Sequence, residues 1–590
     1  MRRFSPLAAV VALVLLLSAC AGLPMYDAPQ PGEPVLGAPD QDIQSQPDLP
    51  REGAPADEIW RGFLLANGSS TDGYEVAREY LSDDLAVSWV PTSNVVIRSG
   101  DAQVAEIDNI ESGTIEATIT VDSVLGGDGN FIEFDGEETQ TESFTLNQIA
   151  GEWRITELPD GFGLWLSETE FDRQFRKAEI SYVSATEDIF VSDSRWFPRA
   201  DGFSTALARA LLEPTPAYLD GAVRTGVVEG MDLAAGGVPI DVATSTATVN
   251  LRGPGLADDE DRVRMLWAQF TQTLTQVGGV DQVVLQLNGQ PLELPEGQEA
   301  LDSAAALGFE TLDPLDEYGL VRNGTSLALV NPDDHALAEM DPEVEGIEIP
   351  ASVSQKWEAL AVDESLSTLA GVDEDRETLW LRGDNGAQQF GNLGTSLTDP
   401  QLVGDGTVWI GAARGSTPAV WVLDADAGED QEPTRLEAEW LTPDLELHQL
   451  SVSPDGSRVA VLNHPTDGGA DEIGIAGIVR NADGEPIGLA PPRREFAVFE
   501  TVDNASWATD ESLVVLGKRA EDTDVRPFVA PLNDRLEPLG EAPSAQTVQG
   551  FLTEAGLQAF VVTTDGTVLT REGAGWQSYR EGDDLVVPGK

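Results

Sequence analysis

The spacing of apolar residues changes from helical to extended within the first folded part of the chain. Along residues 57–64, apolar side chains recur three or four positions apart behind two acidic residues, which predicts an amphipathic helix. A second helix is predicted after Gly73. From Thr114 onward apolar and polar residues alternate, which indicates strands, and shorter alternating segments follow at residues 131–134, 144–146 and 153–155. Helices followed by an antiparallel sheet predict an α+β domain over residues 55–160.

The next two segments differ in their aromatic content and in their periodicity. Residues 161–198 are rich in Phe and Tyr, so we interpret them as an aromatic connector that packs along the domains on either side. Residues 199–297 combine helical and extended patterns, which predicts an α/β domain. Its predicted elements are a helix at 204–212, a strand at 247–251, an amphipathic helix at 258–277 and a strand at 280–287 that ends in Asn288-Gly289.

From about residue 310 the helical periodicity disappears and short strands recur with turn signals between them. An Asp-Gly pair precedes an apolar strand at Asp405-Gly406, Asp455-Gly456 and Asp565-Gly566. Looser copies lie between these, and spacings of roughly 30 to 55 residues fit propeller blades with variable loops. We therefore predict an all-β propeller of five to seven blades over residues 310–590.

The first 54 residues have the pattern of an export signal and a tether. Two arginines precede a short apolar run that ends in Leu17-Ser18-Ala19-Cys20, and the run is too short for a spanning helix. The ending resembles a bacterial lipobox, in which residues 1–19 are removed and Cys20 carries a diacylglycerol group and an N-acyl chain such as palmitate. An ordinary signal peptide with an accidental cysteine is the alternative. Residues 20–54 are rich in Pro, Gln and Asp, which predicts a disordered tether.

Composition limits the partners that the chain can bind. Its formal net charge is −69, and the acidic residues are spread along the sequence, which is typical of a strongly solvated surface. Such a chain is repelled by nucleic acid, so nucleic-acid binding is not expected. Cys20 is the only cysteine, so the mature protein contains no disulfide and must be stabilised by buried cores.

The order of these parts resembles the LpqB lipoprotein family of actinobacteria. The residues that carry the resemblance are the lipobox and the segments 62–64, 76–81, 195–198, 210–212, 222–225 and 453–456. The resemblance implies a multidomain fold, with an N-terminal α+β domain, a GerMN-like α/β domain and a C-terminal propeller. It further implies a lipid-anchored protein on the extracytoplasmic face of the cell membrane. Its implied partner is the sensor domain of the histidine kinase MtrB, whose signalling it tunes in cell-wall and division control.

The sequence offers little support for an enzyme or a metal site. We find no Gly-x-Ser-x-Gly elbow and no phosphate-binding loop, and we expect neither catalytic residues nor a cofactor. His335, His448 and His464 have no metal-binding spacing. The acidic segment 424–430 departs from a calcium loop at its glycine and at its twelfth position, so we interpret it as a solvated hairpin.

Binding of cell-wall glycan, with peptidoglycan as the partner, is the main alternative function. It would use exposed aromatic side chains in the propeller, because sugar rings stack on them. The tryptophans of the chain are nevertheless interpreted mainly as core residues; those considered are Trp60, Trp89, Trp409, Trp421 and Trp507.

Overall fold

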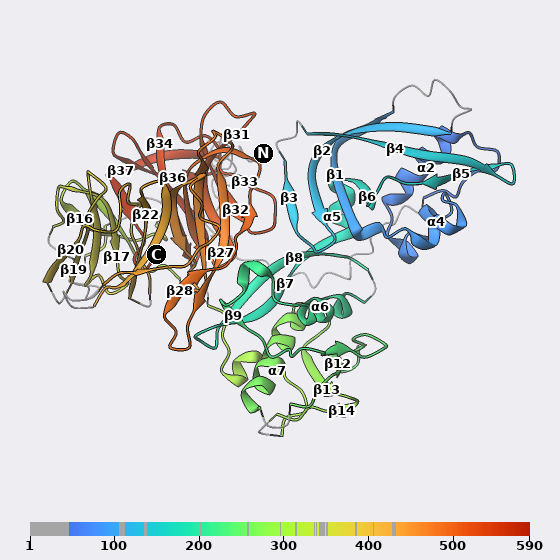
Figure 1. The fold of residues 1–590 in the computed structure, drawn as a ribbon, viewed down its shortest axis with the longest axis horizontal. Helices are drawn as coiled ribbons and strands as arrows, with labels where there is room; N and C mark the ends of the chain where they lie inside the picture. The colour runs from blue at the N-terminus through green and yellow to red at the C-terminus, as the bar shows by residue number, and fades with distance from the viewer. Residues whose placement is uncertain are drawn as a thin grey trace, which may run out of the picture. The chain divides into compact units, whose positions relative to one another are not determined.

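The computed structural model describes residues 47–590, apart from some short internal stretches (Figure 1). These stretches are 105–112, 135–137, 201, 257–258, 295–296, 313–314, 335–336, 338, 342–348, 350–351, 384–385, 405 and 427–431. Residues 1–46 also lie outside the described residues, and with them the signal peptide, the lipobox residues Leu17, Ser18, Ala19 and Cys20, and most of the predicted tether. Among the described helices, none has the length and apolar character needed to cross a membrane.

The N-terminal domain is a curved sheet with helices against one face (Figure 1). Its helices are α2 (Ala56–Asn67), α3 (Glu75–Arg78), α4 (Asp83–Ser88) and α5 (Glu168–Gln174). Its strands are β1 (Asn94–Val104), β2 (Thr114–Gly126), β3 (Phe131–Glu133), β4 (Thr139–Ile149), β5 (Glu152–Glu157) and β6 (Leu164–Ser167). The predicted helix at 57–64 is confirmed within α2, and Trp60 and Trp89 are buried in the core that α2 forms with the sheet.

The sheet of this domain has the order β5-β4-β2-β1-β6, with β3 beside β2. Strand β1 lies between β2 and the edge strand β6, antiparallel to β2 and parallel to β6. Strand β6 and helix α5 come from the start of the segment interpreted as a connector. The capping box of α5 fixes its start, because Ser167 and Glu170 each bond the backbone of the other.

The rest of that segment forms a long hairpin between the first domain and the GerMN-like domain. Its strands β7 (Phe175–Ser184) and β8 (Phe190–Pro198) are joined on the β7 side by β9 (Val223–Arg224). The inner positions of both strands are buried, which agrees with the predicted packing of the aromatic residues against their neighbours. Helix α7 packs on β7, so the hairpin belongs to the body of the protein.

The GerMN-like domain is built around a parallel strand pair with a helical crossover. Strands β12 (Thr246–Arg252) and β13 (Gln282–Leu287) run parallel, and α7 (Glu260–Thr275) connects them. The remaining elements are α6 (Phe203–Leu212), β10 (Asp232–Leu233), β11 (Ile240–Asp241) and β14 (Gln290–Pro291). The apolar face predicted for α7 is buried, with Leu266, Trp267 and Phe270 fully inaccessible. The predicted α/β fold is therefore confirmed.

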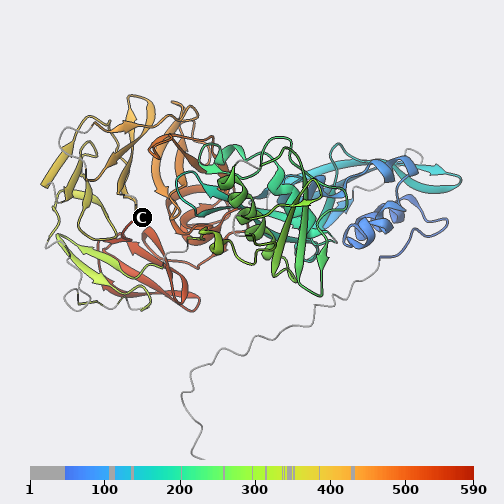
Figure 2. The same cartoon turned by 90° about the horizontal axis from the view of Figure 1, so that it is seen from below.

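The C-terminal part is a propeller whose described residues form six sheets around an axis (Figure 2). Blade 1 contains β15 (Gly319–Asn323), β16 (Ser326–Val330) and β38 (Asp584–Val586); blade 2 contains β17 (Trp357–Val362), β18 (Leu369–Asp373), β19 (Leu379–Gly383) and β20 (Gly386–Phe390). Blade 3 contains β21 (Gln401–Leu402), β22 (Thr407–Arg414), β23 (Thr417–Asp424) and β24 (Thr434–Arg435); blade 4 contains β25 (Leu445–Val452), β26 (Arg458–Pro465), β27 (Glu472–Arg480), β28 (Pro486–Leu489) and β29 (Arg493–Glu495). Blade 5 contains β30 (Phe499–Thr509), β31 (Ser512–Arg519), β32 (Arg526–Pro531) and β33 (Glu537–Pro538); blade 6 contains β34 (Ala545–Thr553), β35 (Gly556–Thr563), β36 (Thr567–Glu572) and β37 (Gly575–Glu581).

The ring is closed by the last strand of the chain. Strand β38 pairs with β15, so blade 1 contains strands from both ends of the propeller sequence. Gly456 and Gly566 have positive φ angles of 63° and 75°, as the predicted Asp-Gly turns require. Trp409, Trp421 and Trp507 are buried in the blades, so the interpretation of these tryptophans as core residues is confirmed.

Candidate functional site

The described cavities of the propeller follow its central channel. The narrow part has a volume of about 60 Å³ and is lined by residues of the inner strands of several blades. It shares Asp399, Gln449, Asn504 and Thr547 with a wider cavity of about 260 Å³ at one mouth. It shares Lys590 with a cavity of about 240 Å³ at the other mouth. The channel is therefore a candidate site that no single blade could form.

Side-chain amides join neighbouring blades along the wall of the channel. The Oε1 atom of Gln449 in blade 4 accepts the Ala505 N–H of blade 5 at 2.9 Å. The Oδ1 atom of Asn504 in blade 5 accepts the Val548 N–H of blade 6 at 2.8 Å. Because each amide oxygen is held by a backbone N–H, each NH₂ group is directed elsewhere. The inner strands thus use polar residues both to hold the ring together and to line its axis.

The wide mouth carries charges of both signs. Its lining includes Arg376, Asp399, Glu446, His448 and Asp503. Arg376 forms an ion pair with Asp399 at 2.9 Å, which fixes one side of the mouth. Burial raises the pKa of Asp503, and the nearby His448 opposes this shift. The mouth therefore combines fixed charges with hydrogen-bonding groups from the channel wall.

Two of the three histidines meet beside this mouth. His448 on β25 and His464 on β26 have ring centroids 4.6 Å apart, and His464 Nδ1 contacts the Asp471 carboxylate. His335 lies outside the described residues. No group of three or more His, Cys, Asp or Glu side chains suited to a metal ion occurs among the described residues. The sequence analysis did not anticipate this pair, whose spacing of 16 residues depends on the hairpin between β25 and β26.

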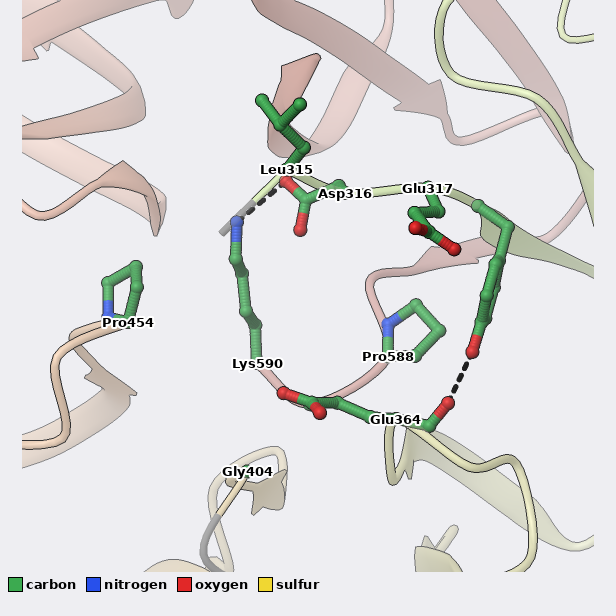
Figure 3. A pocket seen from close by; sticks show the side chains of 10 residues that line it. Leu315, Asp316, Glu317, Glu364, Gly404, Pro454, Pro588 and Lys590 are labelled. Carbon is green, nitrogen blue, oxygen red and sulfur yellow. Dashed lines mark hydrogen bonds and ion pairs between the residues drawn. The ribbon is translucent and has the colours of Figure 1, made fainter. Parts of the chain in front are cut away.

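The opposite mouth is crossed by an ion pair between the two ends of the propeller sequence (Figure 3). Lys590 Nζ lies 2.7 Å from Asp316 Oδ2, and both side chains are about nine-tenths buried. The same carboxylate accepts the Leu552 N–H of blade 6 at 2.7 Å. Burial raises the pKa of Asp316, and the Lys590 charge opposes this effect. Tyr318 Oη donates to the Glu364 carbonyl oxygen, which connects this mouth to blade 2. Together these contacts tie blades 1, 2 and 6.

A carboxyl group between the two mouths is strongly perturbed. Burial and the nearby Asp399 carboxylate raise the pKa of Asp584 to about 7, against the attraction of Arg322. Asp584 lies at the start of β38, the strand that closes the ring. The channel therefore contains a group that titrates near neutrality.

A single asparagine in the propeller binds two other parts of the protein. Asn533 is 2% exposed and follows β32 with a positive φ angle of 55°. Its Nδ2 group donates to the Gly129 and Ser194 carbonyl oxygens at 2.9 and 2.7 Å. Its Oδ1 atom accepts the Phe131 N–H at 2.5 Å. The N-terminal domain and the hairpin are thus both fixed to blade 5.

A buried charge network extends this junction into blade 4. Arg493 of β29 lies 2.9 Å from Asp193 of β8 and 2.6 Å from Glu495. Asp193 also accepts a hydrogen bond from the Tyr218 hydroxyl at 2.7 Å, and its own side chain is 1% exposed. The Arg493 charge is balanced by the two carboxylates, as a buried charge must be, although its Nη2 atom has no hydrogen-bond partner among the described residues. The junction therefore couples the hairpin, the GerMN-like domain and the propeller.

The sequence analysis also considered the acidic segment 424–430 and Cys20, but no described residue of these is part of the channel or the junction. Asp424 and Asp426 are described, and Asp424 Oδ1 accepts the Asp426 N–H at 2.9 Å, as in a local turn. Residues 427–431 lie outside the described residues, so the interpretation of this segment as a solvated hairpin stays a prediction. The lipidation of Cys20 also stays a prediction.

Comparison with known families assigns all three folded parts. Residues 49–172 match a model described as the N-terminal domain of lipoprotein LpqB. Residues 179–293 match a model described as sporulation and spore germination, and residues 329–588 match the β-propeller domain of lipoprotein LpqB. The predicted fold class, with a GerMN-like domain between an α+β domain and a propeller, is confirmed.

Curated relatives extend this similarity over the whole chain. A lipoprotein LpqB of Thermobifida fusca is 26% identical, over 100% of this chain and 99% of its own length. One from Mycolicibacterium smegmatis is 23% identical, over 98% and 97%. Among solved structures, the tandem GerMN domains of the sporulation protein GerM from Bacillus subtilis are 20% identical over 26% of this chain and 58% of that one, with a TM-score of 0.19. A TM-score that low supports no conclusion about this protein.

Proposed function

The chain belongs to the LpqB family of lipoproteins, and we propose that it is an accessory protein that modulates the sensor kinase of a two-component system. In this proposal Cys20 carries the lipid that holds the protein at the extracytoplasmic face of the cell membrane. The kinase is of the MtrB type, and it controls cell-wall metabolism and division. Support comes from relatives named lipoprotein LpqB that match over nearly the whole length of both chains.

The junction at Asn533 is the observation that carries the proposal. Domains within a chain normally move against one another, unless a substantial interface holds them. Here Asn533 and the Arg493 network fix the hairpin, and through it both smaller domains, to the propeller. A partner that binds one domain therefore meets the others at a defined distance and angle. Such a body is suited to present a composite surface to a membrane receptor.

The charge of the chain supports a protein partner with a basic face. With 103 acidic and 34 basic residues, the protein attracts a complementary partner over a distance and repels like-charged molecules. Association with the kinase should consequently slow as salt concentration rises. We expect the interface on the kinase to be rich in Arg and Lys.

Binding of cell-wall glycan remains the second candidate function. The polar channel favours it, because hydroxyl-rich ligands bind to arrays of amide and carboxyl groups. Trp409 and Trp507 do not favour it, since they are at most 1% exposed and cannot stack on a sugar.

Crosslinking in living cells separates the two functions. An affinity-tagged copy is crosslinked, and captured material from the membrane fraction is identified by mass spectrometry. Recovery of a histidine kinase with the wild-type protein, and its loss with Cys20→Ala, is the result that the proposal predicts. Recovery of wall fragments alone, together with binding to purified peptidoglycan that survives high salt, would replace it with the glycan-binding function.

A further inference from the structure

The wide mouth of the channel and its narrow part form one continuous cavity. Both parts are lined by Asp399, Gln449, Asn504 and Thr547. The wider part has a volume of about 260 Å³, below the range of roughly 300 to 1,000 Å³ for drug-sized ligands. A single sugar ring or a molecule of similar size is therefore the scale of ligand that fits.

The wall of this cavity presents amide donors that the protein itself leaves unused. Asn504 is 6% exposed, and its Oδ1 atom is held by the Val548 N–H. Within the described part of the chain, its Nδ2 group has no hydrogen-bond partner. Gln449 is arranged in the same way, because its Oε1 atom accepts the Ala505 N–H. The oxygen atoms are fixed by backbone donors, so the free NH₂ groups face the channel.

A third amide continues the series into blade 6. Gln549 accepts the Ser506 hydroxyl at 2.9 Å through its Oε1 atom and also lines the narrow part. Three successive blades thus each place an amide on the wall, and in each the oxygen atom accepts a hydrogen bond from a neighbouring blade. These residues line the channel, so a ligand or water that supplies acceptor oxygens can bind to their NH₂ groups.

The rim of the same mouth supplies negative charge. Glu446 and Asp503 are exposed, and neither forms a salt bridge or a side-chain hydrogen bond among the residues that the structure describes, although His448 and His464 lie near Asp503. Asp399 is already neutralised by Arg376. The two unpaired carboxylates lie at the entrance to a cavity whose wall carries amide donors. A ligand with an ammonium group at the rim and hydroxyl groups farther in would therefore pair with both the carboxylates of the rim and the amide donors of the wall.

We propose that this mouth binds a small polyhydroxylated amine, with the chemistry of an amino sugar that has a free ammonium group. Its hydroxyl oxygens accept hydrogen bonds from the NH₂ groups of Gln449 and Asn504. Its ammonium group forms ion pairs with Glu446 and Asp503. A free amino sugar and the deacetylated end of a glycan share this chemistry. The proposal is independent of any kinase, because the site lies wholly within the propeller.

Titration calorimetry on the full-length protein in detergent tests the site with three matched probes. Glucosamine carries the ammonium group, glucose lacks it and N-acetylglucosamine has it blocked. We expect saturable binding of glucosamine, with binding of the other two weaker by at least about tenfold, as expected for a charge-assisted contact. A short deacetylated oligosaccharide identifies the source: tighter binding than glucosamine indicates a glycan end, and equal binding indicates the free sugar.

Two variants separate the roles of the rim and the wall. The double variant Glu446→Gln, Asp503→Asn should abolish the preference for glucosamine over glucose. Gln449→Glu keeps an oxygen that accepts the Ala505 N–H but replaces the NH₂ donor with a second carboxylate oxygen. Glucose binding should therefore weaken by about fivefold. Glu537→Gln on the outer strand β33 is the matched control and should change nothing. The melting temperature of each variant confirms that the ring is intact.

Absence of saturable glucosamine binding at millimolar concentration would overturn the proposal. The proposal would also be overturned if the double variant and Gln449→Glu both bound glucosamine as strongly as the control Glu537→Gln does. Neither result would bear on the proposed kinase interaction, which is tested by crosslinking.

Discussion

Replacing Asn533 by alanine removes three buried hydrogen bonds at once. The Ser194 carbonyl oxygen loses this donor and the Phe131 N–H loses its acceptor, whereas the Gly129 carbonyl oxygen keeps the Trp196 N–H as a donor. Each buried group left without a partner costs about 1 to 3 kcal/mol. Alanine at a φ angle of 55° adds about 1 kcal/mol of backbone strain. Water that enters the junction offsets part of this cost. We expect the free energy needed to separate the N-terminal domain and the hairpin from blade 5 to fall by about 4 to 6 kcal/mol.

The consequence should be local opening at the junction while the propeller stays folded. Hydrogen exchange measured by mass spectrometry reports it directly, because the amides of Phe131 and Trp196 donate across the junction and become accessible when it opens. A loss of about 4 kcal/mol corresponds to exchange that is faster by about a thousandfold, provided that reclosing is faster than chemical exchange, so that the rate follows the opening equilibrium. Peptides from blades 2 and 3 should exchange at the wild-type rate.

Two further variants divide this effect into its parts. Asn533→Gly loses the same side-chain bonds without the backbone strain, so its effect should be smaller by about 1 kcal/mol. Asn288→Ala is the control, because Asn288 has the same φ angle of 55° but lies in an exposed turn of the GerMN-like domain. Wild-type exchange at Phe131 in Asn533→Ala would refute the argument that this residue fixes the junction.

Three other predictions concern charge and anchoring. Lys590→Met leaves Asp316 without its buried partner and should lower the free energy of unfolding by about 3 kcal/mol in urea denaturation; an unchanged midpoint would show that the ion pair does not hold the ring closed. Burial and a hydrogen bond to Glu179 raise the pKa of Glu511, so the folded state binds this proton more tightly than the unfolded state, and its stabilising effect is lost as pH rises. Glu511→Gln should therefore raise the melting temperature more at pH 8 than at pH 5, and an equal change at both pH values would contradict this assignment. Cys20→Ala should release the protein from membranes washed with carbonate, and continued sedimentation with them would exclude lipid anchoring through this residue.

The features that sequence alone predicted are those that depend on local periodicity. Helix α7 was predicted because its apolar residues repeat with the helical period and two glycines follow it. The strands of the propeller were predicted because Asp-Gly turns separate short apolar runs. These signals are contained within one element, so they survive without knowledge of the rest of the fold.

Strand β1 was missed because its sequence does not alternate over its length. Its apolar residues Val95, Val96 and Ile97 are consecutive, since both faces of this part of the strand are buried, and polar residues follow. The hairpin β7–β8 was interpreted as a connector for a similar reason: its strands are buried on both faces, and no turn signal as strong as Asn-Gly joins them. Burial on two faces removes the alternation by which strands are recognised.

The channel and the junction could not be predicted, because their residues meet only when the ring closes. Gln449 and Asn504 have the appearance of solvent-facing residues in a strand, and nothing near them in sequence marks an inter-blade bond. Asn533 lies about 400 residues from Gly129, its partner in the first domain. Contacts of such separation depend on topology, which periodicity does not encode.

The most direct test of the proposed function is the autophosphorylation of the sensor kinase in membrane vesicles. Vesicles are prepared from cells that contain the wild-type protein, from cells that contain Cys20→Ala and from cells that lack the gene, at equal kinase content. The account predicts that the rate with the wild-type protein differs from the rate without it, and that Cys20→Ala behaves as the deletion does. Equal rates in all three preparations would contradict the claim that this lipoprotein modulates the kinase.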